Sequence, residues 1–117
     1  MKLREVIQIL DAQVLSGIED LETDLQAGCG CDLMSDVLSY IKPGALLLTG
    51  LNNLQAIRTA EIAEIKAICF VRGKQPNEGM VAAAREKGVI LLATPMPLFE
   101  ACGRLYAGGL KGSFDND

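Results

Sequence analysis

Several residue types that common functional sites need are missing or scarce in this sequence. Histidine is absent, which excludes Ser–His and Cys–His catalytic pairs and every metal site that contains histidine. Tryptophan is absent too, and aromatic residues make up 4% of the chain, too few for a base-stacking platform. The net charge of −4 provides no basic footprint for nucleic acid or for an anionic membrane. We therefore expect neither of these partners.

Long hydrophobic runs are missing as well, although 50% of the residues are hydrophobic. No apolar run approaches the length of about 18 residues that suggests a membrane span. The first ten residues carry charges within a helical apolar pattern, unlike a signal peptide. We expect a cytoplasmic protein with free thiols. Its 117 residues predict a single domain, 1–117, that is large enough to form a core without disulfides or metal.

The central segment, residues 44–74, predicts a strand, a helix and a second strand. Residues 45–48 and 67–71 are continuous apolar runs, typical of strands that are covered on both faces. Between them, two apolar stripes have helical spacing. One stripe consists of the large residues Leu51, Leu54, Ile62 and Ile65. The other consists of the small residues Ala56, Ala60 and Ala63. A helix between two such strands predicts a βαβ unit with parallel strands.

The rest of the chain continues the alternation of strands and helices. We expect a helix over 3–10, a strand at 13–15, an acidic loop, and a short strand near 25–31. Asp32 is the expected N-cap of the next helix, and Pro76 the expected opening of a later one that ends at Gly88. The inward residues of the helix after Asp32 are expected to be Leu33, Met34, Val37, Leu38 and Ile41.

The last strand is expected at 89–93. Thr94 and Pro95 would start a final helix that ends at 108–109, and residues 110–117 read as a polar tail that frays. The fold class predicted from this order is a layered α/β domain, with a mainly parallel sheet flanked by helices.

Polar or flexible residues follow each expected parallel strand at its carboxyl end. In open parallel sheets these ends meet at one edge, where ligands bind. We expect one ligand-binding site there, with these candidate residues: Asp32, Ser35, Thr49, Gly50, Asn52, Asn53, Arg72, Gly73, Lys74 and Thr94.

The chemistry of that edge suggests an anion. Segment 49–53 lies at the start of a helix, where free N–H groups and the helix dipole favour negative charge. Arg72 could grip a phosphate or carboxylate with two hydrogen bonds, and Lys74 could add a point charge. Capping alone explains the same residues, with Thr49 and Asn52 as caps and Gly50 in a tight turn. Both interpretations stay open.

Cys29 and Cys31 form a C-x-C string that could act as a redox pair or hold a cluster. No C-x-x-C pair accompanies them, and Cys69 and Cys102 are expected to be buried apart from them. Residues two apart on a strand face the same side, so both thiols could simply pack inward. We expect no metal and no cofactor.

The helix within 51–65 is apolar on two sides, with one arginine inside the stripe of large residues. Such a surface more often meets a second chain than water, so we expect a homodimer. Its interface residues would be Leu54, Arg58, Glu61 and Ile62, and Arg58 and Glu61 are spaced for an ion pair.

Three stretches carry a family resemblance: DLMSDVLSYIKPGALLLTG, NLQAIRTAEIAEIKAICFVRGKQP and ILLATPMPLFEACGRLY. Residues 28–110 resemble the DRTGG domain family, and more closely the stand-alone proteins similar to the N-terminal domain of HPr kinase/phosphorylase. The resemblance implies a parallel α/β layer fold, a regulatory or interaction role and a tendency to dimerise. It also implies an association with iron-only hydrogenase systems of anaerobes.

The chain departs from the motif that names this family. Residues 51–53 read Leu-Asn-Asn where the family has Asp-Arg, and residues 71–73 read Val-Arg-Gly where it has Thr-Gly-Gly. A kinase is not implied, because the chain contains no G-x-x-x-x-G-K loop followed by serine or threonine.

Three functional hypotheses follow. The first is a non-catalytic, homodimeric regulatory module that senses an anionic small molecule, nucleotide-like or phosphate-like, or a partner protein. The second is a protein-binding accessory factor in redox or carbon metabolism, linked to iron-only hydrogenase. The third is a thiol or cluster carrier that uses Cys29 and Cys31. None of the three is an enzyme with a recognisable catalytic constellation.

Overall fold

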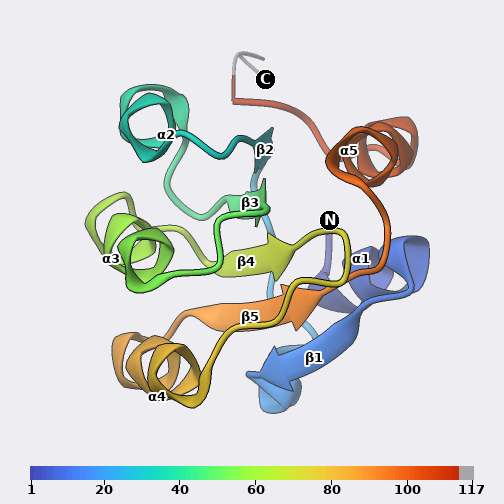
Figure 1. The fold of residues 1–117 in the computed structure, drawn as a ribbon. Coiled ribbons are helices and arrows are strands. Elements are labelled where there is room, and N and C mark those ends of the chain that lie inside the picture. The colour runs from blue at the N-terminus through green and yellow to red at the C-terminus, as the bar shows by residue number, and fades with distance from the viewer. Residues whose placement is uncertain (114–117) are drawn as a thin grey trace.

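The structure is a computed structural model that describes residues 1–113. Strands and helices alternate along this part of the chain (Figure 1). In chain order the elements are α1 (Leu3–Leu10), β1 (Gln13–Ser16), the short 3-10 helix η1 (Ile18–Asp20), β2 (Gly28–Gly30), α2 (Met34–Tyr40), β3 (Leu46–Thr49), α3 (Leu54–Ile62), β4 (Ala67–Phe70), α4 (Glu78–Lys87), β5 (Ile90–Ala93) and α5 (Leu98–Ala107).

The five strands form one sheet in the order β1-β5-β4-β3-β2. Strands β2 to β5 are mutually parallel, and β1 pairs with β5 in the antiparallel direction. The predicted α/β class with a mainly parallel sheet is therefore confirmed, as is the central unit of β3, α3 and β4.

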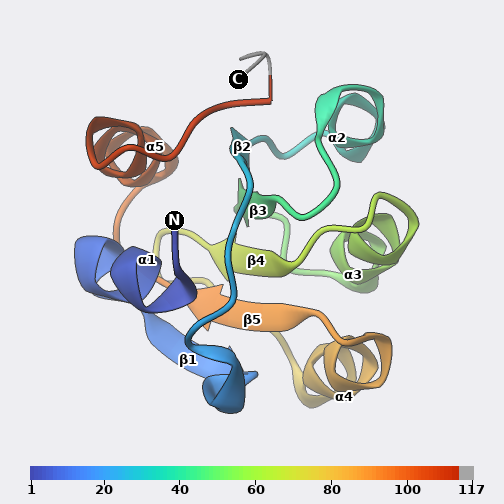
Figure 2. The same cartoon turned by 180° about the vertical axis from the view of Figure 1, so that it is seen from behind.

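Helices cover both faces of the sheet. Helices α2, α3 and α4 lie on one face, and α1 and α5 lie on the other (Figures 1 and 2). Every residue of β3, β4 and β5 is buried, which explains why these strands are apolar without alternation. The sheet thus separates two hydrophobic clusters, and the strand ends form a rim that the helices leave uncovered.

Helix α3 turns its small residues toward the sheet. Ala56 and Ala60 are buried together with Ile57, whereas Leu54 and Ile62 are 44% and 70% exposed. Ile65, the last residue of the stripe of large residues, lies beyond the helix and is buried. Both stripes have helical spacing, so the sequence alone did not show which of them faces the core. Small side chains let the helix lie close to the tightly packed sheet.

The prediction of an ion pair between Arg58 and Glu61 within α3 is wrong. The Glu61 carboxylate pairs with the ammonium group of Lys87, from α4, at 3.0 Å, and not with Arg58. A hydrogen bond to Glu61 raises the pKa of Lys87. Arg58 is exposed on the same surface.

The start of α2 also differs from the prediction. Its N-cap position is held by Leu33, which makes no capping hydrogen bond, and not by Asp32. Met34 and Val37 are buried as expected, but Leu33 and Leu38 are exposed. With only 7 residues, α2 rests on the sheet with a narrower apolar face than the pattern suggested.

Two helix starts were placed too early. Asn77 caps α4 by accepting a hydrogen bond from the Met80 N–H at 2.9 Å, so Pro76 precedes the helix instead of opening it. Helix α5 begins after Pro97, three residues beyond Thr94. The residue before each helix, Asn77 and Pro97, has extended backbone, with ψ of 174° and 162°, so the helix begins only after it.

The beginning of the expected frayed tail is ordered against the sheet. Leu110 is buried, and the Gly28 N–H donates to the Lys111 carbonyl at 2.8 Å, beside β2. Residues 114–117 of that prediction lie outside the described residues. Within residues 1–113, no helix has the length and hydrophobicity that crossing a membrane requires.

Candidate functional site

The loops after β2, β3 and β4 lie side by side at the carboxyl rim of the sheet (Figure 1). The parallel register pairs Gly30 with Leu48, and Thr49 with Phe70. The polar residues that follow these strands are therefore neighbours, although they are far apart in sequence. We call this group the Asp32–Arg72 cluster; its members are Asp32, Thr49, Gly50, Asn52, Arg72 and Lys74.

Asp32 is the centre of the cluster. Its Oδ1 accepts hydrogen bonds from the Gly50 N–H at 2.7 Å and from the Thr49 hydroxyl at 2.9 Å. The Gly50 hydrogen bond is the main reason why the pKa of Asp32 is lowered; Thr49 and the charges of Arg72 and Lys74 lower it further, against an opposing effect of burial. Asp32 is thus a carboxylate that cross-links two strand ends, and not the helix cap expected from its position.

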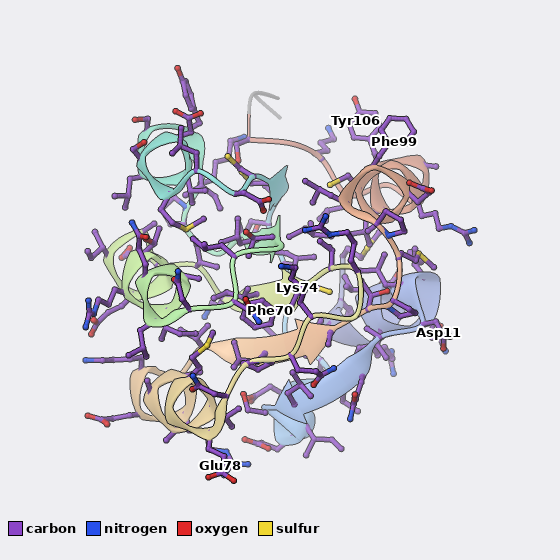
Figure 3. All side chains as sticks on the ribbon, in the orientation of Figure 1. Asp11, Phe70, Lys74, Glu78, Phe99 and Tyr106 are labelled. Carbon is purple, nitrogen blue, oxygen red and sulfur yellow. The ribbon has the colours of Figure 1, made fainter. Side chains whose placement is uncertain are left out.

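Arg72 and Lys74 bring positive charge to the same place. A Cβ placed on Gly50 would lie 3.0 Å from a guanidinium nitrogen of Arg72 and 3.6 Å from Oδ2 of Asp32. The missing side chain of Gly50 thus lets both charged groups approach the loop. Among residues 1–113 neither cation forms an ion pair with a carboxylate. Lys74 lies at the end of β4, beyond Phe70 (Figure 3).

The backbone of the loop after β4 is held in an uncommon conformation. Arg72 has a φ of 57°, in the left-handed region that L-residues seldom adopt, and Gly73 follows with 70°. The Arg72 N–H donates to the Met96 carbonyl and the Gly73 N–H to the Thr94 carbonyl, each at 2.9 Å. These contacts with the loop after β5 fix the direction in which Arg72 leaves the sheet.

The two asparagines of segment 49–53 have different roles. Asn52 donates its side-chain N–H to the Gln75 carbonyl at 3.0 Å and so joins the loop after β3 to the loop after β4. Asn53 is the N-cap of α3 and accepts from the Gln55 N–H at 3.0 Å. Capping does operate here, but through Asn53 and not through Thr49 or Asn52.

Besides Asn53, which caps α3, and Gly73, which holds the loop after β4 through its backbone, two further candidate residues are not brought into the cluster. Thr94 lies at the same rim, but its side chain is buried and its hydroxyl donates to the Leu10 carbonyl of α1 at 2.6 Å. Ser35 is exposed on α2, and no hydrogen bond described for it reaches the cluster. The sequence placed both near the right edge, but side-chain direction depends on the neighbouring elements.

Comparison with known proteins agrees with this fold. A family model described as the DRTGG domain matches residues 5–107 and thus includes the whole cluster. The chain belongs to the DRTGG domain family. No match was found among curated proteins.

One solved structure resembles this DRTGG domain closely in fold. It contains the CBS and DRTGG domains of the regulatory region of Clostridium perfringens pyrophosphatase, complexed with the activator diadenosine tetraphosphate. The TM-score is 0.69 at 13% sequence identity, over 97% of this chain and 49% of the other. The chain therefore spans about half the length of the structure it matches. Identity this low supports the shared fold alone.

In the described part of this DRTGG domain, no cysteine side chain hydrogen-bonds to a member of the cluster, although Cys31 directly precedes Asp32. Burial raises the pKa of the Cys69 thiol to about 12, and burial is also the main reason why the pKa of Cys29 and Cys102 is raised. Cys31 exchanges hydrogen bonds with the backbone of Leu33. Among residues 1–113, no group of three or more potential ligands is arranged to hold a metal ion. The raised pKa values disfavour reactive thiolates.

Sequence reasoning missed an apolar cavity of about 330 Å³ between β2 and α5. Gly28, Gly30, Cys102, Leu105 and Leu110 are among the residues that line it. Without side chains on the two glycines, Leu110 and Cys102 lie close against β2. Phe99 and Tyr106 of α5 also line it, and they are 85% and 67% exposed (Figure 3). Their spacing of seven residues was the only sequence signal for this surface.

Proposed function

We propose that this DRTGG domain is a cytoplasmic, non-catalytic regulatory module that binds an anionic small molecule, nucleotide-like or phosphate-like, at the Asp32–Arg72 cluster. The observation that carries the proposal is that the Arg72 guanidinium lies beside Gly50, and that Arg72 and Lys74, whose charges both act on Asp32, form no ion pair with a carboxylate within residues 1–113. A bound phosphate or carboxylate would supply that partner, with charge-assisted hydrogen bonds.

The position of the cluster, at the carboxyl ends of the parallel strands, supports a ligand site. Ligands of parallel sheets bind beyond the carboxyl ends of the strands. Strands β2 to β5 follow one another without a reversal of order, so the cluster lies along a row of loops and not at a switch point. The nucleotide activator in the structurally similar regulatory region makes nucleotides the first ligands to test.

Thermal-shift measurements with AMP, ATP, diadenosine tetraphosphate, acetyl phosphate and inorganic phosphate test this proposal. A ligand at 100 times its Kd stabilises the folded state by about 2.7 kcal/mol, which is readily seen as a higher melting temperature. We expect at least one nucleotide to stabilise the protein, and Arg72→Gln to weaken that effect by tenfold or more in apparent Kd.

Lys66→Gln is the matched control for Arg72→Gln. Lys66 is exposed and lies just before β4, at the opposite rim of the sheet, so its replacement removes one positive charge away from the cluster. The proposal fails if no compound in the panel stabilises the protein, or if both variants weaken binding equally. The latter result would indicate general attraction of anions and not a site.

We further propose that the domain forms a homodimer through α3. The four interface candidates Leu54, Arg58, Glu61 and Ile62 all line one groove, which α4 completes with Ala83 and Lys87. The groove is mostly apolar and includes the exposed Ile62 side chain. Burial of such a side chain in a dimer contributes about 1.5–3 kcal/mol.

Light scattering after size-exclusion chromatography tests the dimer. Ile62→Glu should convert a dimer into a monomer, because a charge at the centre of an apolar interface is costly. Ile18→Glu is the control, since Ile18 is equally exposed but lies in η1, outside the groove. A wild-type monomer at micromolar concentration would contradict the proposal.

A second candidate function, a protein-binding accessory factor in redox or carbon metabolism, is favoured by the exposed Phe99 and Tyr106 beside the apolar cavity. Large aromatic side chains are typical anchors of protein interfaces. Tagged protein should recover one specific partner from an anaerobic extract, and Phe99→Glu should abolish the recovery whereas Ile18→Glu should not. Equal recovery of the partner by the two variants would show that this surface is not the binding site.

A further inference from the structure

Within the Asp32–Arg72 cluster, the donors most suited to an incoming anion are already occupied. The turn after β3 offers the Gly50 N–H and the Thr49 hydroxyl, and Oδ1 of Asp32 accepts from both. A phosphate placed at this turn would lose those donors and would also face a carboxylate at close range, where like charges repel strongly. Asp32 therefore acts as an internal anion at this position.

The groups that remain divide into two kinds. The Asp32 carboxylate is exposed and ionised at neutral pH, so it can only accept further hydrogen bonds. The side chains of Arg72 and Lys74 can only donate. Since Arg72 and Asp32 both border the same point above Gly50, a single small molecule can contact both kinds of group.

We propose that Asp32 is a specificity-determining residue, which makes the cluster select a nucleoside phosphate over free phosphate or an acyl phosphate. The phosphate of the ligand binds Arg72 and Lys74, and its ribose hydroxyls donate to Asp32. Carboxylates bind ribose hydroxyls in this way in other nucleotide-binding folds. An acyl phosphate offers no hydroxyl donor, so it leaves the Asp32 carboxylate without a contact and retains the repulsion. This inference rests on the proposed function and names its ligand class.

Isothermal titration calorimetry of the full chain with three probes tests the proposal: AMP, 2′,3′-dideoxy-AMP and inorganic phosphate. We expect the wild type to bind AMP at least tenfold more tightly than either of the other two. In Asp32→Asn the neutral side chain should reduce the preference for AMP over the dideoxy compound to less than threefold. In Asp32→Ala the freed donors and the lost repulsion should strengthen phosphate binding at least tenfold.

Asp36→Asn is the matched control. Asp36 is an exposed acid in the first turn of α2, outside the cluster, so this variant changes the net charge by the same amount. It should bind all three probes like the wild type. Circular dichroism melts of each variant confirm that it is folded at the titration temperature.

The outcomes separate this inference from the proposed function. If the wild type binds AMP and dideoxy-AMP equally, or binds phosphate as tightly as AMP, the module binds an anion but Asp32 does not select it. If the wild type binds none of the three and Asp32→Ala gains no phosphate binding, this inference is wrong, and the proposed function is wrong as well if ATP, diadenosine tetraphosphate and acetyl phosphate also fail to stabilise the protein. If Asp36→Asn gains phosphate binding like Asp32→Ala, net charge and not the position of Asp32 is responsible, and the inference is overturned.

Discussion

The carboxyl rim of the sheet contains two contrasting regions, the loop after β3 and the loop after β5. A buried threonine stands at the start of each, and each hydroxyl accepts a hydrogen bond from the N–H two residues later. The Thr49 hydroxyl donates to the exposed carboxylate of Asp32, whereas the Thr94 hydroxyl donates to the buried end of α1. The same residue at the same kind of position thus belongs to a candidate ligand site in one loop and to the core in the other.

The difference lies in the neighbouring elements. Strand β5 pairs with β1, and the chain segment before β1 brings the last carbonyls of α1 to the rim, where they need a donor. Strand β3 lies between β2 and β4, whose loops carry charged residues that water can reach. Location at the rim is therefore necessary for a role in the cluster but not sufficient.

Removal of the Thr94 hydroxyl should give the larger loss of stability. Thr94→Val leaves the buried Leu10 carbonyl without its donor, which costs about 1–3 kcal/mol in the free energy of unfolding. Urea denaturation measures this loss, and the affinity for any ligand of the cluster should not change. A decrease in affinity would show that Thr94 belongs to the site after all.

The corresponding change in the other loop should affect binding more than stability. In Thr49→Val the N–H of Leu51 can bond with water, so we expect a loss of about 0.5–1.5 kcal/mol in the free energy of unfolding. The pKa of Asp32 should rise toward its ordinary value, because one of the donors that lower it is gone. Carbon-detected NMR titration of the Asp32 carboxyl measures that shift; an unchanged pKa would mean that Thr49 does not act on Asp32.

The smallest expected effect is the loss of stability at low pH that comes from protonation of Asp32. The pKa of Asp32 is lowered from 3.8 in the folded protein, so its contribution to stability is fully present above pH 3.8 and is lost as the pH falls through the lower folded value. Between pH 6 and pH 3 the wild type should therefore lose slightly more stability than Asp32→Asn. Asp36→Asn should follow the wild type. Equal losses in all three proteins would show that the Asp32 contacts do not contribute to stability.

Much of the fold could be predicted from local patterns. Continuous apolar runs located β3, β4 and β5, since a strand covered on both faces needs apolar residues at every position. Helical spacing located α1, and Gly88, with a φ of 73°, marked the end of α4. The starts of α2, α4 and α5 were misplaced, because short polar residues and prolines allow several boundaries.

The location of the candidate site could be predicted from the sequence, but the contacts among its side chains could not. The alternation of strands and helices implied that Asp32, Gly50 and Arg72 follow neighbouring parallel strands. It did not show that Asp32 accepts hydrogen bonds from the next loop, or that Thr94 turns toward α1. These contacts join residues 18 and 84 positions apart, beyond the reach of any local pattern.

The amino-acid sequence by itself determined the class of the fold, the order of its elements and the rim to which the polar loops belong. Hydrophobic burial applies to every residue of a strand or helix, so the spacing of apolar residues along the sequence follows the period of that element. Only the tertiary structure decided which stripe of α3 faces the sheet. It also decided which groups form hydrogen bonds or ion pairs with Asp32, Glu61 and Thr94. Each of these depends on a few directional contacts between distant segments, whose geometry exists only after the sheet has assembled.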